Sequence, residues 1–171
     1  MRLWRLSKEA YAADLSGMGG LFGGGRWHNK GTRIVYTSTT PSLCALEFLV
    51  HVDPLLAPAN LRMVDITVPD DLEIETVADP TAIAGGWRDY PAPSALADFG
   101  SRWVREERTP LLAVPSALTA VGLDVERNFL LNPTHPLASS ASIVASKPFT
   151  YDTRLLYRRP RSDPPFGGKV A

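Results

Sequence analysis

A run of glycines followed by an arginine is the first feature of this 171-residue sequence that could bind a ligand. Gly23, Gly24 and Gly25 directly precede Arg26. Glycines allow the backbone to come close to a ligand, and backbone N–H groups can then face anionic oxygens. The planar guanidinium of Arg26 is suited to the oxygens of a diphosphate. The alternative is a surface loop with a solvated arginine, and the motif by itself leaves both interpretations open.

Glu47 is the second candidate, because it is the only acidic residue between positions 15 and 52. On the helix expected here, its neighbours three and four positions away are Leu43, Cys44, Val50 and His51. A carboxylate in such surroundings is either buried with a cationic partner or lines a pocket. The sequence therefore leaves a structural ion pair and a catalytic role equally open.

Two further side chains could contribute to a site. Tyr36 shares one face of a predicted strand with Ile34, as a core tyrosine would, but it could also stack on a flat heterocycle. Ser116 follows Pro115 directly after an apolar segment, where sites are often built. No nucleophile-elbow motif surrounds Ser116, so an ordinary turn serine is the alternative.

Other common chemistries are not indicated. Neither the GxGxxG pattern nor the P-loop pattern can be read in the sequence. The three histidines and the single cysteine lack metal-ligand spacing, so we expect no metal. Cys44 and His51 would lie about 10 Å apart on one helix, which is too far for a nucleophile–base hydrogen bond.

The elements that would position these residues are short strands and separate helices. We expect strands over residues 32–36, 61–68, 111–114, 129–131 and 143–146. A helix should begin at Pro41 after an N-cap at Thr40 and end near residue 51, and Ser94 should cap another. The glycines of residues 17–25 predict a loop. Without regular βαβ alternation, the fold class is α+β.

Composition limits the functional classes. The 18 basic and 18 acidic residues balance, so no general field draws the chain to nucleic acid or an anionic membrane. A single cysteine fits a reducing compartment, and no segment has the apolar length of a signal peptide or membrane span, so we expect a cytoplasmic protein. We expect one domain over residues 1–157 and a flexible tail over 158–171.

Six segments, in chain order, resemble the RES domain, a family named for an Arg, a Glu and a Ser. They are residues 3–5, 24–27, 31–38, 45–51, 114–116 and 128–136. The resemblance spans residues 2–156. One position departs from it: the family usually has Asn directly after Arg-Trp, where this chain has His28 followed by Asn29.

The resemblance implies a fold of small mixed or antiparallel sheets with packed helices, similar to diphtheria-toxin-like ADP-ribosyltransferases. It implies that NAD⁺ is the substrate and that no metal takes part. The family's catalytic residues fall on Arg26, Tyr36, Glu47 and Ser116. The further candidates for contacts with NAD⁺ are Gly25, Arg5, Arg127, Asn128 and Asn132.

The resemblance also implies the toxin of a bacterial toxin–antitoxin pair. Such a protein would cleave the nicotinamide–ribose bond of NAD⁺, with water or phosphate as the acceptor. Glu47 would support the positive charge that develops on the ribose, as in glycoside cleavage. The alternatives are transfer of ADP-ribose to a protein, or a catalytically dead RES-like binding module. The expected partner is an Xre-type antitoxin that blocks the site in a hetero-oligomeric complex, without direct nucleic-acid or membrane binding.

Overall fold

The computed structural model describes residues 1–52, 59–119 and 125–156, and in these residues seven strands form one mixed sheet. Across the sheet the strand order is β4-β5-β6-β2-β1-β3-β7, with β4–β5 the parallel pair and the other neighbours antiparallel. The strands are β1 (Arg2–Lys8), β2 (Val35–Ser38), β3 (Leu61–Thr67), β4 (Ile74–Thr76), β5 (Leu111–Val114), β6 (Asn128–Leu131) and β7 (Ser142–Phe149). The expected α+β class is confirmed.

The helices are short apart from two. They are α1 (Gly19–Phe22), α2 (Pro41–Leu49), α3 (Ser94–Arg105) and α4 (Thr153–Leu156), with 3-10 turns at Glu9–Tyr11, Pro80–Ala82 and Pro136–Ser140. The start of α2 is as predicted: the Thr40 Oγ1 accepts a hydrogen bond from the Leu43 N–H at 3.1 Å. The prediction for Ser94 is wrong, because Ser94 is the first helical residue and Pro93, which offers no side-chain cap, precedes it.

Other boundaries differ from the predictions because packing decides them. Residues 17–25 are not all loop, since α1 forms where Gly20 approaches the Thr32 carbonyl so closely that a Cβ would lie 2.0 Å from it. The strand expected over 32–36 is β2, which starts three residues later, where pairing with β6 begins. β1 was not predicted at all, although β2 and β3 pair with it on both sides. The predicted tail lies outside the described residues.

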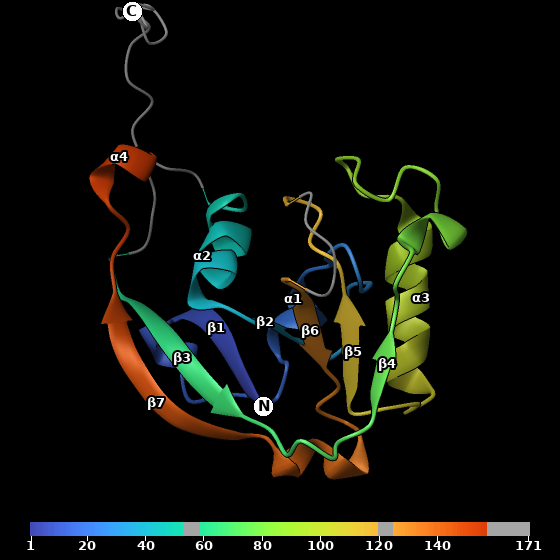
Figure 1. Cartoon of the computed structure of the whole chain (residues 1–171), viewed down its shortest axis with the longest axis horizontal. Coiled ribbons are helices and arrows are strands. Elements are labelled where there is room, and N and C mark those ends of the chain that lie inside the picture. The colour runs from blue at the N-terminus through green and yellow to red at the C-terminus, as the bar shows by residue number, and fades with distance from the viewer. Residues whose placement is uncertain (53–58, 120–124, 157–171) are drawn as a thin grey trace, which may run out of the picture.

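One face of the sheet carries both long helices (Figure 1). Residues paired directly across two strands point to the same face. Tyr36 is paired with Leu130, which packs in the cluster that α3 buries. Ser38 is paired with Trp4, which packs in the cluster that α2 buries. Tyr36 and Ser38 therefore lie on this face of β2, between the parts of the sheet that α3 and α2 cover.

Two features of the fold bear on the function classes above. Among the residues that the structure describes, no helix combines the length and the apolar character needed to cross a membrane. The opposite face of the sheet buries a separate cluster around Leu3, Val64 and Phe129. The two faces thus have distinct cores, and only one of them holds the predicted Tyr36 and Glu47.

Candidate functional site

A tight turn presents Arg26. The Gly25 N–H donates to the His28 carbonyl at 2.9 Å, and the His28 N–H donates back at 3.4 Å. Arg26 and Trp27 form the tip of this turn. The Trp27 ring is buried against α3, where Gly100 is so close that a Cβ would lie 2.0 Å from the Trp27 carbonyl oxygen. The turn is thereby fixed to α3.

The guanidinium of Arg26 is oriented by the loop of residues 87–89. It donates to the Trp87 carbonyl oxygen, and to the Asp89 carbonyl oxygen at 3.2 and 3.3 Å. Partial burial lowers the pKa of Arg26, and the negative charges of Glu47 and Asp89 oppose that shift. An arginine stays cationic under such a shift, and its five N–H donors exceed what these carbonyls use. It can therefore still bind an anion.

Tyr36 has an accessible ring and an engaged hydroxyl. The residue is 36% exposed. The hydroxyl oxygen accepts a hydrogen bond from the Trp27 N–H at 3.1 Å and lies 2.9 Å from His28 Nδ1. Burial raises the pKa of the Tyr36 hydroxyl. The phenol is therefore protonated, and its ring face is the part open to a ligand.

The carboxylate of Glu47 is held from the sheet. Glu47 is half-buried on α2, and the Asn128 side-chain amide donates to its Oε1 at 2.6 Å. The Asn128 Oδ1 in turn accepts a hydrogen bond from the Ser38 hydroxyl at 2.6 Å. Sequence reasoning missed Ser38. Its place two residues after Tyr36, on the same strand face, was the available signal.

Arg26, Tyr36, Glu47 and Asn128 come together between α2 and α3. The charge of Glu47 opposes the lowering of the Arg26 pKa and adds to the rise of the Tyr36 pKa. Such effects require the charged groups to be near one another, since solvent screens exposed charges over longer distances. The Arg26 turn, β2 and α2 are neighbouring segments of the chain that place a cation, an aromatic ring and a carboxylate around one site, and Asn128 joins them from the distant strand β6.

Ser116 lies at the same end of the sheet as Asn128, because β5 residue Val114 pairs with Asn128. It is buried, and its hydroxyl oxygen accepts hydrogen bonds from the Leu118 N–H at 3.1 Å and the Thr119 N–H at 3.4 Å. The oxygen thus closes a turn, and among the described residues the Ser116 hydroxyl donates no hydrogen bond. A role in binding remains a prediction.

A further contact links the Ser116 turn to the loop that orients Arg26. The Arg88 Nε donates to the Ala117 carbonyl at 3.1 Å. The Ser116 turn and the 87–89 loop are therefore neighbours, and the predicted Ser116 sits next to the site without joining its hydrogen bonds.

Two predicted contact residues, Arg5 and Arg127, are engaged elsewhere. Arg5 is half-buried, its guanidinium donates to the Asp14 carbonyl, and desolvation lowers its pKa. Arg5 lies on the side of β1 that bears Leu3, whereas Trp4 faces α2. Arg127 has its guanidinium 6.0 Å from the Phe129 ring centroid. Their roles toward NAD⁺ remain predictions that these contacts do not favour.

Asn132 supports the fold at the far end of β6. It is fully buried, its amide donates to the Val104 carbonyl at 3.0 Å, and its Oδ1 accepts hydrogen bonds from Thr134. At about 3.3 Å per residue, β6 separates Asn132 from Asn128 by about 13 Å. The predicted contact of Asn132 with NAD⁺ therefore lacks geometric support.

Gly25 is fitted against the site rather than open to it. A Cβ at this position would lie 2.8 Å from His28 Cε1 and 3.0 Å from the Tyr36 hydroxyl. Real Cβ atoms are almost never found at such distances, so any side chain at residue 25 would displace this pair. The predicted importance of Gly25 thus has a packing reason, independent of ligand contact.

In the described part of the chain, no arrangement of side chains favours metal or thiol chemistry. No group of three or more His, Cys, Asp or Glu side chains there could hold a metal ion. Burial raises the pKa of Cys44 to about 12, which keeps the thiol protonated at neutral pH.

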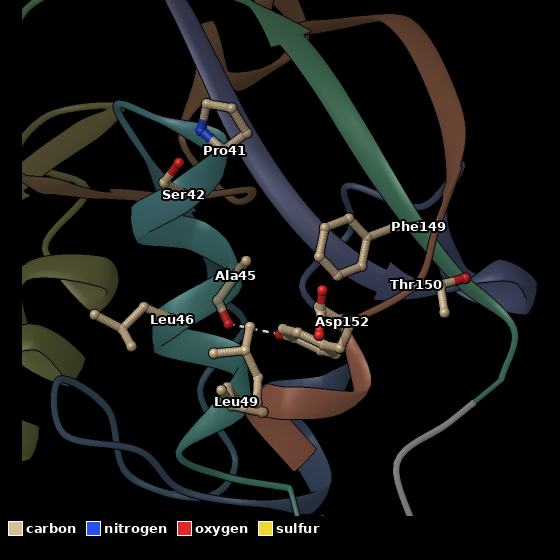
Figure 2. Close-up of a pocket in the computed structure, with 10 residues that line it drawn as sticks. Pro41, Ser42, Ala45, Leu46, Leu49, Phe149, Thr150 and Asp152 are labelled. Carbon is tan, nitrogen blue, oxygen red and sulfur yellow. Dashed lines mark hydrogen bonds between the residues drawn. The ribbon is translucent and has the colours of Figure 1, made fainter. Parts of the chain in front are cut away.

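A groove of about 450 Å³ runs along another side of α2 (Figure 2). Its lining comes from α2 and from the end of β7 through the start of α4, and includes Leu46, Leu49 and Phe149. The Tyr151 hydroxyl, also in the lining, donates to the Ala45 carbonyl at 2.6 Å. The residues predicted for the site are not among those that line this groove.

The fold and site together define an α+β domain with an arginine, a tyrosine and a glutamate gathered between two helices on one sheet face. The chain belongs to the RES domain family, whose model matches residues 2–152. This match covers every element from β1 to β7 and all the site residues described above.

The chain is similar to proteins of several bacteria. The chain is 38% identical over 157 residues to the "Prs ADP-ribosylating toxin" of Sphingobium sp. (strain YBL2), covering 90% of this chain and 95% of that one. It is 41% identical over 157 residues to "Toxin Res" of Pseudomonas putida, covering 91% and 99%. The toxin–antitoxin complex MbcT–MbcA of M. tuberculosis contains a chain with the same fold, with a TM-score of 0.68, 19% identity and 91% and 86% coverage.

Proposed function

We propose that this protein is the toxin of a bacterial toxin–antitoxin pair and that it degrades NAD⁺ by cleaving the nicotinamide–ribose bond. Membership of the RES family and relatives named Toxin Res support the first part. The observation that carries the second part is the Glu47 carboxylate, held by Asn128 at 2.6 Å near Arg26 and Tyr36.

Glu47 has the properties that this cleavage needs. The bond to nicotinamide breaks with its electron pair going to the ring nitrogen, so a neutral base leaves and positive charge develops on the ribose. A fixed carboxylate stabilises such a charge more than it stabilises the ground state. Water or phosphate then adds to the ribose carbon and loses a proton. Glu47 would lie beside the sugar, with the Asn128 bond fixing its direction.

The other two residues would bind the two ends of the substrate. The remaining donors of Arg26 would hold the diphosphate as a planar fork. The accessible ring face of Tyr36 would stack on nicotinamide and orient it. The Ser116 hydroxyl would donate its proton to a ribose hydroxyl or to the acceptor.

The test measures loss of NAD⁺ by the purified, antitoxin-free protein, with and without phosphate. The Glu47→Gln variant should fold normally and lose about 10²-fold or more in turnover, because the amide cannot support the developing cation. Glu73→Gln, which neutralises an exposed carboxylate, is the matched control and should behave as the wild type. Normal turnover by a well-folded Glu47→Gln protein would refute the assignment.

A second candidate is transfer of ADP-ribose to a protein. The name of the Sphingobium relative, 38% identical over 90% of this chain, favours it. Incubation with labelled NAD⁺ and cell lysate separates the two: free ADP-ribose or its phosphate ester supports degradation, and a labelled protein band supports transfer. If NAD⁺ persists in every condition, a non-catalytic RES-like binding module is the better description.

An antitoxin partner follows from the same proposal. A free NAD⁺ consumer would harm the cell that makes it, and a solved structure with this fold is a toxin–antitoxin complex. We expect an Xre-type antitoxin, encoded by a neighbouring gene, that covers the site in a hetero-oligomer. Co-expression with that gene product should preserve cellular NAD⁺ and growth.

A further inference from the structure

His28 is buried directly behind Tyr36. The residue is 7% exposed. The Nε2 atom lies 3.0 Å from the Gly23 carbonyl oxygen, and the Nδ1 atom lies 2.9 Å from the Tyr36 hydroxyl oxygen. The ring planes are inclined by 57° with centroids 5.4 Å apart, so the two residues meet through their polar atoms rather than by parallel stacking.

These contacts fix where each proton lies. A carbonyl oxygen only accepts hydrogen bonds, so Nε2 must carry the imidazole proton toward Gly23. A neutral imidazole has one N–H, so Nδ1 is an acceptor and the Tyr36 hydroxyl donates to it. The same hydroxyl oxygen accepts from the Trp27 N–H at 3.1 Å. The Tyr36 proton therefore points toward His28 Nδ1.

We propose that His28 is the positioning residue of Tyr36: by accepting the tyrosine proton at Nδ1 and anchoring Nε2 on Gly23, it fixes the ring so that Tyr36 offers a flat face rather than an acid. The inference deepens the proposed function and rests on it insofar as Tyr36 contributes to NAD⁺ cleavage.

The hydrogen bonds from Tyr36 to His28 and from His28 to Gly23 form a relay, and its surroundings hold it in one arrangement. Gly25 covers it so closely that a Cβ would lie 3.0 Å from both His28 Nδ1 and the Tyr36 hydroxyl. Among the described residues, Arg26 on the same turn and Glu47 on α2 are the charged groups that act on the Tyr36 hydroxyl. Asp89 on the 87–89 loop acts on Arg26, and Asp98 on α3 accepts a hydrogen bond from the Asn29 side chain at 2.7 Å.

The pair depends on a neutral imidazole. Burial lowers the pKa of His28, which keeps the ring neutral in the range where the protein would act. A proton on Nδ1 would face the Tyr36 hydroxyl donor and force it to turn. In a profile of NAD⁺ consumption against pH, the fall on the acid side, the acid limb, should therefore contain a step caused by protonation of His28.

The first test observes the relay itself, without reference to activity. Nitrogen NMR of the histidine-labelled, full-length protein at neutral pH should show His28 as the neutral Nε2–H tautomer. The exposed His51 provides the internal reference. A His28 that carries its proton on Nδ1, or that is doubly protonated at neutral pH, would overturn the proposal whether or not the protein consumes NAD⁺.

The second test asks whether His28 acts through the Tyr36 hydroxyl. In the wild-type background, His28→Ala should lower kcat by about five- to tenfold, because Tyr36 loses a hydrogen bond that orients it. KM should change little, because Arg26 keeps its hydrogen bonds to the 87–89 loop. His28→Asn should recover most of this loss, because Asn Oδ1 offers an acceptor near the position of Nδ1. It should also remove the His28 step from the acid limb.

The decisive comparison repeats His28→Ala in a Tyr36→Phe background, where no hydroxyl remains to be held. There, His28→Ala should cost nothing further. The same loss in both backgrounds would assign His28 a merely structural role, and an Asn variant as impaired as the Ala variant would also reject the relay. If the wild type fails to consume NAD⁺, the proposed function fails, while the tautomer measurement still decides the inference about His28.

Discussion

Glu47 takes its orientation from two strands rather than from its own helix. The Ser38 hydroxyl on β2 holds the Asn128 side chain on β6, and Asn128 donates to the Glu47 carboxylate on α2. A bond to a charged acceptor is worth more than one between neutral groups, and here it also fixes geometry. Asn128 is therefore expected to matter more for turnover than for stability.

Replacing Asn128 with Asp tests this at the residue scale. The variant keeps an oxygen for the Ser38 hydroxyl but sets a second carboxylate against Glu47, where the amide donor stood at 2.6 Å. Like charges this close oppose each other, so we expect NAD⁺ consumption at neutral pH to fall at least about tenfold.

The matched control for Asn128→Asp is Ser38→Ala, which loosens Asn128 without adding charge. It should cost less than the Asp variant in the same assay. Equal activity of wild type and Asn128→Asp would contradict the role given to this hydrogen bond.

Among the elements, α2 and α3 position the two halves of the site. Thr40 caps α2 and also donates from its hydroxyl to the Glu126 carboxylate at 2.8 Å, which ties the start of the helix to the segment before β6. α3 holds the Arg26 turn through Trp27 and Gly100. The site thus depends on close packing of a helix against a turn, which leaves no room for a methyl group at residue 100.

Gly100→Ala should destabilise the protein, although a glycine-to-alanine change within a helix usually stabilises it. In an exposed helix, Gly→Ala stabilises by about 1 kcal/mol. Here the new Cβ would lie 2.0 Å from the Trp27 carbonyl oxygen, and backbone must move. We expect a loss of about 1–3 kcal/mol in the free energy of unfolding, measured by denaturant titration, together with reduced NAD⁺ consumption.

Gly19→Ala in α1 is the control for the Gly100 variant, because a Cβ at Gly19 meets no atom within 4 Å. It should leave the stability unchanged or slightly raised. A Gly100→Ala protein as stable as this control would show that α3 can move away from the turn without cost.

For the whole molecule, stability should depend on pH in two separate windows. The pKa of His28 is lowered by burial, so the unfolded chain binds its proton more readily than the folded protein does. Folding stability is then fully present above about pH 6.5 and falls as the pH drops below it, by up to about 1.4 kcal/mol per unit. The Ser16 hydrogen bonds are the main cause of the lowered pKa of Asp14. This carboxylate adds stability that is lost only at more acid pH.

Denaturant titrations across this range measure the effect. His28→Asn should flatten the decline that begins near neutral pH and leave the more acid one unchanged. His51→Asn, at an exposed position, should preserve both. A wild-type stability that does not change between pH 7 and pH 5 would contradict the buried neutral state of His28.

The sequence by itself determined features that depend on near neighbours along the chain. Thr40 before Pro41 predicts the start of α2, and Pro115 predicts the end of β5, because capping and the missing proline N–H act within a few residues. The isolated acid at Glu47 and the arginine after the glycines were also visible as candidates, and with them the α+β class.

Tertiary structure alone decided how these residues meet. The bonds from Asn128 to Glu47 and from Ser38 to Asn128 join residues 81 and 90 positions apart, and they exist only because β2 and β6 pair in one register. Strand β1 and the pairing of His28 with Tyr36 were hidden for the same reason. Strand pairing and burial arise from contacts across the sheet, whereas sequence patterns report only the preferences of each segment.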